Sequence, residues 1–131
     1  MIFLIDHNIE GHSVILLGEI ASQGWLSLIS IQFITFGEIG LAVESSDRVV
    51  WQKSQSEKMI LLTANRSMKG NDSLEQVMRE ENTPTSLPVI TVGNADRLLV
   101  DFEYRERCAE RLVEIAVDIN DYKGTRRMFI P

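Results

Sequence analysis

Apolar and polar residues form blocks along the chain that predict strands and helices in alternation. Four short, mostly apolar runs have the length of buried strands, and they lie at residues 2–5, 31–36, 59–62 and 89–92. Segments with helical spacing of apolar residues separate most of these runs. Because such alternation favours a mainly parallel sheet covered by helices, we expect an α/β fold, a three-layer α/β/α sandwich with four or five strands.

The predicted helices differ in how clearly the sequence marks their ends. One spans residues 12–22, and its expected core positions are Val14, Leu17, Ile20 and Ala21. A second spans 45–57, where a serine can serve as N-cap and Asp47 adds a negative charge to the first turn. A short third helix carries Leu74, Val77 and Met78 on one face. Residues 37–44 stay unassigned.

The last predicted helix is the longest and spans residues 95–119. Its expected buried positions are Leu98, Phe102, Ala109, Leu112, Val113 and Ala116. Cys108, the single cysteine, lies within it, which excludes an intramolecular disulfide. We expect Cys108 to be a half-buried helix residue.

Length and composition indicate one domain that covers residues 1–131. The chain is 44% hydrophobic and 24% charged, which suits a globular core of ordinary size. No run approaches the roughly 18 apolar residues of a membrane span, and the N-terminus lacks the pattern of a secretion signal. We therefore expect a cytoplasmic protein without a membrane partner.

The net charge of -6 argues against a protein whose whole surface binds nucleic acid, because phosphate affinity rests on Lys and Arg. The negative net charge remains compatible with a local basic rim around a site. Arg66 and Lys69 are candidates for such a rim, whereas Lys123, Arg126 and Arg127 are expected to be solvated surface residues.

Polar side chains follow two of the predicted strands. Asp6 and Asn8 come directly after the first, and Thr63 and Asn65 follow the strand at 59–62, with Asp72 shortly after. In open α/β sheets, ligands bind where the strands end in this way. Carboxylate, amide and hydroxyl oxygens are the ligands that Mg²⁺ and Mn²⁺ prefer, so we expect a metal site at this edge.

Each acid also has a purely structural interpretation. Asp6 and Asn8 suit a turn that caps a helix, Asp47 suits a helix dipole, and Asp72 suits an N-cap with Glu75 three residues later. His7 and His12 raise the alternative of histidine chemistry, but they lack a third ligand nearby, and we expect surface positions.

The same residues resemble those of the PIN-like domains, relatives of metal-dependent ribonuclease toxins. The resemblance rests on Asp6 with Asn8, the helix that begins near Asp47, the segment LLTANR, and Asp72. It implies a parallel α/β/α sandwich whose acidic edge binds Mg or Mn and hydrolyses RNA.

Carried over residue by residue, the resemblance assigns catalytic roles to Asp6, Asp47 and Asp72. Asp6, Asp72 and Asn65 would hold the metal. Asn8, Thr63, Arg66 and Lys69 would bind the substrate. Asn65 departs from the family pattern, because Thr63-Ala64-Asn65 stands where the family has Thr-x-Asp, and an amide brings no full charge and cannot act as a base.

Two other functions fit parts of the pattern. A haloacid-dehalogenase-type phosphatase needs a second Asp two residues after the first, and this chain has Asn8 there. The serious rival is a PIN-like domain that has lost catalysis and serves as a binding or regulatory module. The sequence leaves open the RNA substrate, a protein partner and a homodimer.

Overall fold

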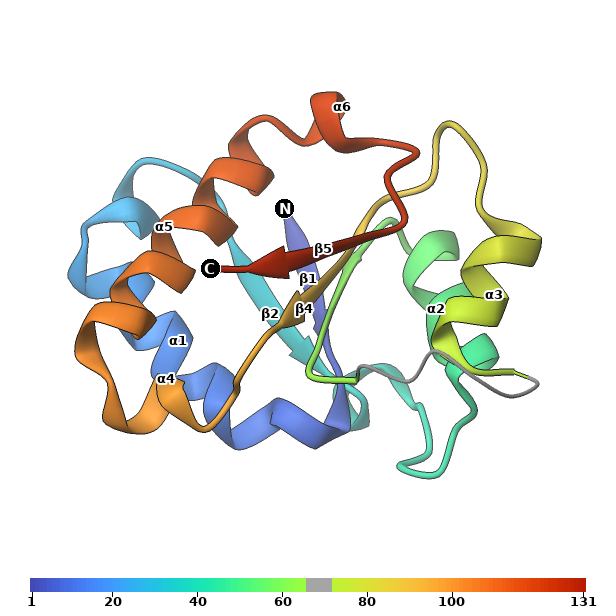
Figure 1. Cartoon of the computed structure of the whole chain (residues 1–131), viewed down its shortest axis with the longest axis horizontal. Helices are drawn as coiled ribbons and strands as arrows, with labels where there is room; N and C mark the ends of the chain where they lie inside the picture. Colours follow the sequence, from blue (N-terminus) through green and yellow to red (C-terminus); the bar gives the residue numbers. More distant parts are fainter. Residues whose placement is uncertain (66–71) are drawn as a thin grey trace.

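Within the described part of the chain, five parallel strands form one central sheet (Figure 1). The structure is a computed structural model that describes residues 1–65 and 72–131. Its strands are β1 (Ile2–Ile5), β2 (Gln32–Thr35), β3 (Ile60–Thr63), β4 (Val89–Val92) and β5 (Arg127–Ile130). Every neighbouring pair is parallel. The predicted α/β class is therefore confirmed.

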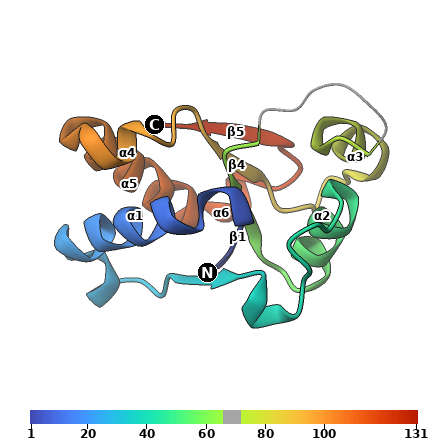
Figure 2. The same cartoon turned by 90° about the horizontal axis from the view of Figure 1, so that it is seen from below.

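Helices cover both faces of this sheet and complete a three-layer sandwich (Figure 2). One face packs against α1 (Glu10–Ser22), α4 (Arg97–Val100), α5 (Phe102–Val117) and α6 (Ile119–Tyr122). The other face packs against α2 (Asp47–Ser56) and α3 (Leu74–Glu81). Single 3-10 turns lie at His7–Ile9, Trp25–Ser27 and Gly37–Ile39.

Alternation along the strands divides the core into two apolar clusters. Phe3 and Ile5 of β1 face α1 and α5, whereas Leu4 faces α2 and α3. Leu61 of β3 pairs with Leu4 and lies on the same side. Because side chains alternate along a strand, Asp6 and Thr63 continue the α2–α3 side beyond these leucines.

The order of the strands places a topological switch point at the end of β1. Across the sheet the order is β2-β1-β3-β4-β5, so the chain leaves β1 toward one edge and returns to its other side as β3. Ligands in open α/β sheets bind at the carboxyl ends of the strands where the order reverses in this way. Here that position lies between β1 and β3.

The predicted buried face of the first helix needs correction. α1 begins at Glu10 and buries Ser13, Leu16, Glu19 and Ile20. Ile20 is buried as predicted, but Val14 is 67% exposed and Ala21 is also exposed, so the buried face is rotated about the helix axis from the predicted one.

The expected helix at 95–119 is instead three helices. Its first break is at Asp101, whose extended backbone ends α4 and whose carboxylate caps α5 by accepting from the amide of Tyr104 at 3.0 Å. Phe102 therefore starts a new helix and is 61% exposed rather than buried. Cys108 is fully buried rather than half-buried. β5 is the fifth strand of the sheet; we expected four or five strands and placed only four from the sequence.

None of the helices in the described residues is both long and apolar enough to cross a membrane.

Candidate functional site

The ends of β1 and β3 are joined by a short hydrogen bond between two polar side chains. Thr63 Oγ1 donates to Asp6 Oδ2 at 2.6 Å. The main chain continues the sheet at this point, because the amide of Asp6 donates to the carbonyl of Leu62 at 2.9 Å. Asp6 precedes the 3-10 turn His7–Ile9 without a side-chain capping bond. The carboxylate is therefore aimed across the switch point of the sheet toward β3.

Burial makes the ionised form of Asp6 less favourable than it is in water. Desolvation raises the pKa of its carboxyl, and the negative charge of Asp47 raises it further. The hydroxyl of Thr63 and the nearby main-chain amides of His7 and Asn8 oppose this shift, and the pKa stays above its ordinary value. A partly buried carboxylate beside a second carboxylate favours the arrival of a cation.

Asn65 extends the network from β3 to α2. Its main-chain amide donates to Thr63 Oγ1 at 2.8 Å, so this buried hydroxyl both donates and accepts. Its side-chain Nδ2 donates to both carboxylate oxygens of Asp47, at 3.1 and 3.0 Å. Because a carboxylate only accepts hydrogen bonds, the nitrogen of the amide must face Asp47. The amide oxygen is then the only atom of this side chain with metal-ligand chemistry.

Asp47 fixes the positions of two helices at the site. It is the first residue of α2, where Ser46 caps the helix by accepting from the amide of Val49. Its Oδ2 also accepts from the amide of Leu74, the first residue of α3, at 3.0 Å. A continuous chain of hydrogen bonds therefore runs from Asp6 through Thr63, Asn65 and Asp47 to α3.

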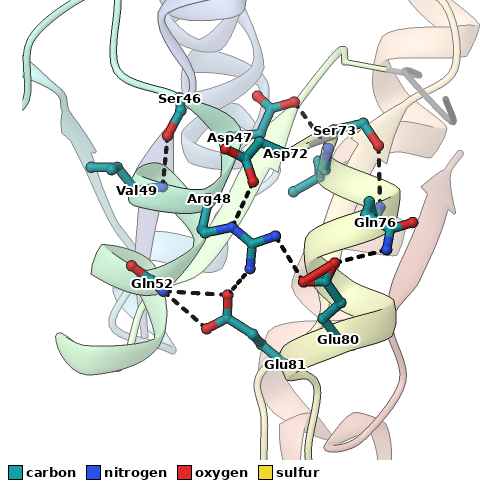
Figure 3. Close-up of polar contacts among 11 residues, drawn as sticks. Ser46, Asp47, Arg48, Val49, Gln52, Asp72, Ser73, Gln76, Glu80 and Glu81 are labelled. Atoms are coloured by element: carbon teal, nitrogen blue, oxygen red, sulfur yellow. Dashed lines mark hydrogen bonds and ion pairs between the residues drawn. The ribbon is translucent and has the colours of Figure 1, made fainter. Parts of the chain in front are cut away.

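Asp72 contacts Arg48 of α2 (Figure 3). Its Oδ1 accepts from Arg48 Nε at 2.8 Å, and Arg48 also pairs with Glu80 and Glu81 of α3. The interpretation of Asp72 as the N-cap of α3 was wrong, because Ser73 caps this helix by accepting from the amide of Gln76. A role for Asp72 in metal binding stays a prediction.

The remaining predicted residues lie around this network or outside the described chain. Asn8 is exposed, and its Oδ1 accepts a long hydrogen bond of 3.4 Å from the amide of Ala64. The turn after β1 therefore contacts the turn after β3. Arg66 and Lys69 lie outside the described residues. His7 contacts Glu10 and His12 contacts Asp96, so the two histidines have separate partners.

Arg127 of β5 belongs to the site although we expected a solvated surface residue. Its side chain is only 6% exposed. Nη1 donates to the main-chain carbonyl of Asn65 and to Thr91 Oγ1, both at 2.6 Å. Nε pairs with Glu75 of α3 at 3.3 Å. The sequence signal that was available is the run Arg-Met-Phe-Ile at 127–130, a short and mostly apolar segment with the length of a strand.

The donor set suits a weakly held hard cation. Asp6 and Asp47 supply carboxylates, Asn65 an amide oxygen and Thr63 a hydroxyl, which are all oxygen ligands. Among the described residues there is no group of three His, Cys, Asp or Glu side chains arranged to hold a metal. Mg²⁺ commonly keeps several waters and uses one or two protein carboxylates, so two acids fit it better than they fit Zn²⁺.

Comparisons of the chain with protein-family models, with curated proteins and with solved structures found no match in any of the three.

Proposed function

We propose that this chain is a metal-dependent phosphodiesterase of the PIN-like type that cleaves RNA in the cytoplasm. The observation that carries the proposal is the hydrogen-bonded pairing of Asp6 with Thr63 and of Asp47 with Asn65 at the switch point between β1 and β3. The raised pKa of Asp6 supports it, since carboxylates held together at a cost to stability are typical of active sites.

In this proposal Asp6 and Asp47 hold Mg or Mn, and Asn65 adds its amide oxygen. Thr63 fixes the orientation of Asp6, because its hydroxyl donates to one carboxylate oxygen and leaves the other for a ligand. The cation, when bound, supplies positive charge for a phosphate group and lowers the pKa of a bound water. Asp6 binds a cation in its ionised form, so the cation and a proton compete for this carboxylate, whose pKa is raised in the metal-free protein.

Asp72 is not part of the proposed metal set. Its carboxylate is paired with the guanidinium of Arg48, and Arg48 is shared with Glu80 and Glu81. An arginine held by three acids ties α2 to α3. Asp72 therefore serves the packing of these helices in our proposal.

The rival function is a binding or regulatory module without catalysis, and one observation favours it. Asn65 satisfies Asp47 with a neutral amide, so Asp47 already has a partner without any metal. A module of this kind would keep the network as a structural link between β3, α2 and α3.

A cleavage assay separates the two functions. The parent protein is incubated with a generic single-stranded RNA and Mn²⁺ or chelator, beside Asp6→Ala and the control Asp121→Ala. Asp121 is exposed on α6, so its loss changes the net charge equally without touching the network. If the chain is an enzyme, the parent protein and Asp121→Ala cleave the RNA in Mn²⁺, whereas Asp6→Ala does not. Equal cleavage by all three proteins would indicate a contaminant and contradict the proposal.

A further inference from the structure

Arg127 connects four elements that come together at the proposed site. Its main chain belongs to β5, and its Nη1 reaches Thr91 on β4 and the carbonyl of Asn65 after β3. Its Nε reaches Glu75 in the first turn of α3. Nη1 carries two hydrogens, and the two 2.6 Å contacts use one each. The guanidinium is thus held in one orientation.

Burying the guanidinium of Arg127 costs stability, which indicates that its position serves a purpose. The side chain is only 6% exposed, and it has one acidic partner, Glu75. Its Nη2 is buried and has no hydrogen-bond partner among the described residues. A buried charge with an unused donor loses solvation without full compensation. An apolar residue would fill the space on β5 at lower cost.

The contact with Asn65 indicates a role for the buried guanidinium of Arg127. Nη1 binds the main-chain carbonyl of the same residue whose side chain binds Asp47. The carbonyl and the amide of Asn65 are therefore both fixed, one by Arg127 and one by Thr63. With its main chain held at two points, the side chain of Asn65 has little freedom to leave Asp47.

We propose that Arg127 is the positioning residue of the site, which holds the turn after β3 so that Asn65 meets Asp47. Its effect on metal binding and cleavage rests on the proposed function, whereas its effect on Asn65 does not. Residues that orient ligands in this way commonly change metal affinity or activity by about 10- to 100-fold when they are replaced.

The test compares Arg127→Gln with Arg127→Lys, Glu75→Gln and the control Arg126→Gln. Arg126 is its exposed neighbour, so this control loses the same charge next to the site. The first readout is the pair of side-chain amide resonances of Asn65 in the metal-free protein, recorded by ¹⁵N-edited NMR. We expect these resonances to move and to exchange faster with water in Arg127→Gln, and to stay in place in Arg126→Gln.

The second readout is the affinity for Mn²⁺ together with kcat and KM on RNA. We expect Arg127→Gln to weaken Mn²⁺ binding and to lower kcat at least tenfold, with KM changed less than kcat. Arg127→Lys should recover part of the loss, because a lysine can still donate to the Asn65 carbonyl. Glu75→Gln should lose less than Arg127→Gln, because it leaves both Nη1 contacts in place.

The two readouts separate the two proposals. Unmoved Asn65 resonances in folded Arg127→Gln would overturn the positioning role, whatever the activity. Moved resonances in a parent protein that neither binds Mn²⁺ nor cleaves RNA would support the positioning role and overturn the proposed function. If Arg127→Gln does not fold, Thr91→Val decides, since it removes one of the two Nη1 acceptors. Moved Asn65 resonances in Thr91→Val would support the positioning role, and unmoved ones would overturn it.

Discussion

Asn65 Nδ2 donates to both carboxylate oxygens of Asp47, at 3.1 and 3.0 Å, and so joins the end of β3 to the start of α2. The residue that departs from the PIN-like pattern is therefore the one that binds the second acid of the site. A carboxylate at position 65 would face Asp47 at the same distance, where two negative charges repel.

Replacing Asn65 with Asp tests this relationship. We expect Asn65→Asp to lower the free energy of unfolding by about 2 kcal/mol in chelator at neutral pH, because a hydrogen bond to a charged group is replaced by repulsion. Added Mg²⁺ should offset the loss by binding the folded state. Chemical unfolding with chelator and with Mg²⁺ measures both, and the exposed Asn120→Asp serves as control. Equal stability of Asn65→Asp and the parent in chelator would contradict the repulsion.

Removing the charge of Asp6 should stabilise the metal-free protein. The folded-state pKa of Asp6 lies above its ordinary value, so ionising it costs stability as the pH rises through that pKa. We expect Asp6→Asn to gain about 0.5 to 2 kcal/mol at neutral pH, a gain seen when functional residues are neutralised. The gain should vanish at a pH below the ordinary Asp pKa, because Asp6 of the parent protein is then neutral too. Thermal unfolding in chelator across this pH range is the measurement. A lower melting temperature for Asp6→Asn at neutral pH would identify Asp6 as a structural residue.

Two neighbours should shift the pKa of Asp6 in opposite directions. Asp47→Asn removes a negative charge and should lower this pKa, whereas Thr63→Val removes a hydrogen bond to the ionised form and should raise it. The carboxyl ¹³C shift of Asp6, followed by NMR as a function of pH, reports the midpoint in each variant. If both variants moved the midpoint in the same direction, the electrostatic description of the site would be wrong.

Cys108 should be unreactive in the folded protein. Its side chain is fully buried in α5, and burial raises the pKa of its thiol to about 12, so almost no thiolate exists at neutral pH. We expect a thiol reagent to modify Cys108 only after unfolding in denaturant. Fast modification of the native protein would show that α5 opens locally.

The end-of-strand rule predicted that Asp6, Thr63 and Asn65 lie close together, and hydrogen bonds join them in the structure. Asp6 and Thr63 each follow a clear apolar strand, and a parallel register brings such positions together. The site role of Asp47 was predicted from the resemblance to the PIN-like domains, because its place in the first turn of a helix suggested only a structural role.

The remaining contacts depend on packing that no local pattern reports. Arg48 meets Asp72 because of how α2 lies against α3, over a separation of 24 residues. Arg127 looked like part of a basic surface cluster, and only the placement of β5 beside β4 buries it. Asp101 ends one helix and caps the next within a run whose apolar spacing reads as continuous.

Calorimetric titration with Mn²⁺ decides whether Asp6 and Asp47 form a metal site. We expect one weak site in the parent protein that is lost in Asp6→Ala and kept in Asp121→Ala. We also expect Asp72→Asn to retain binding, because Asp72 is paired with Arg48. Undiminished Mn²⁺ affinity in Asp6→Ala, or no binding by the parent protein, would show that these residues do not form a metal site.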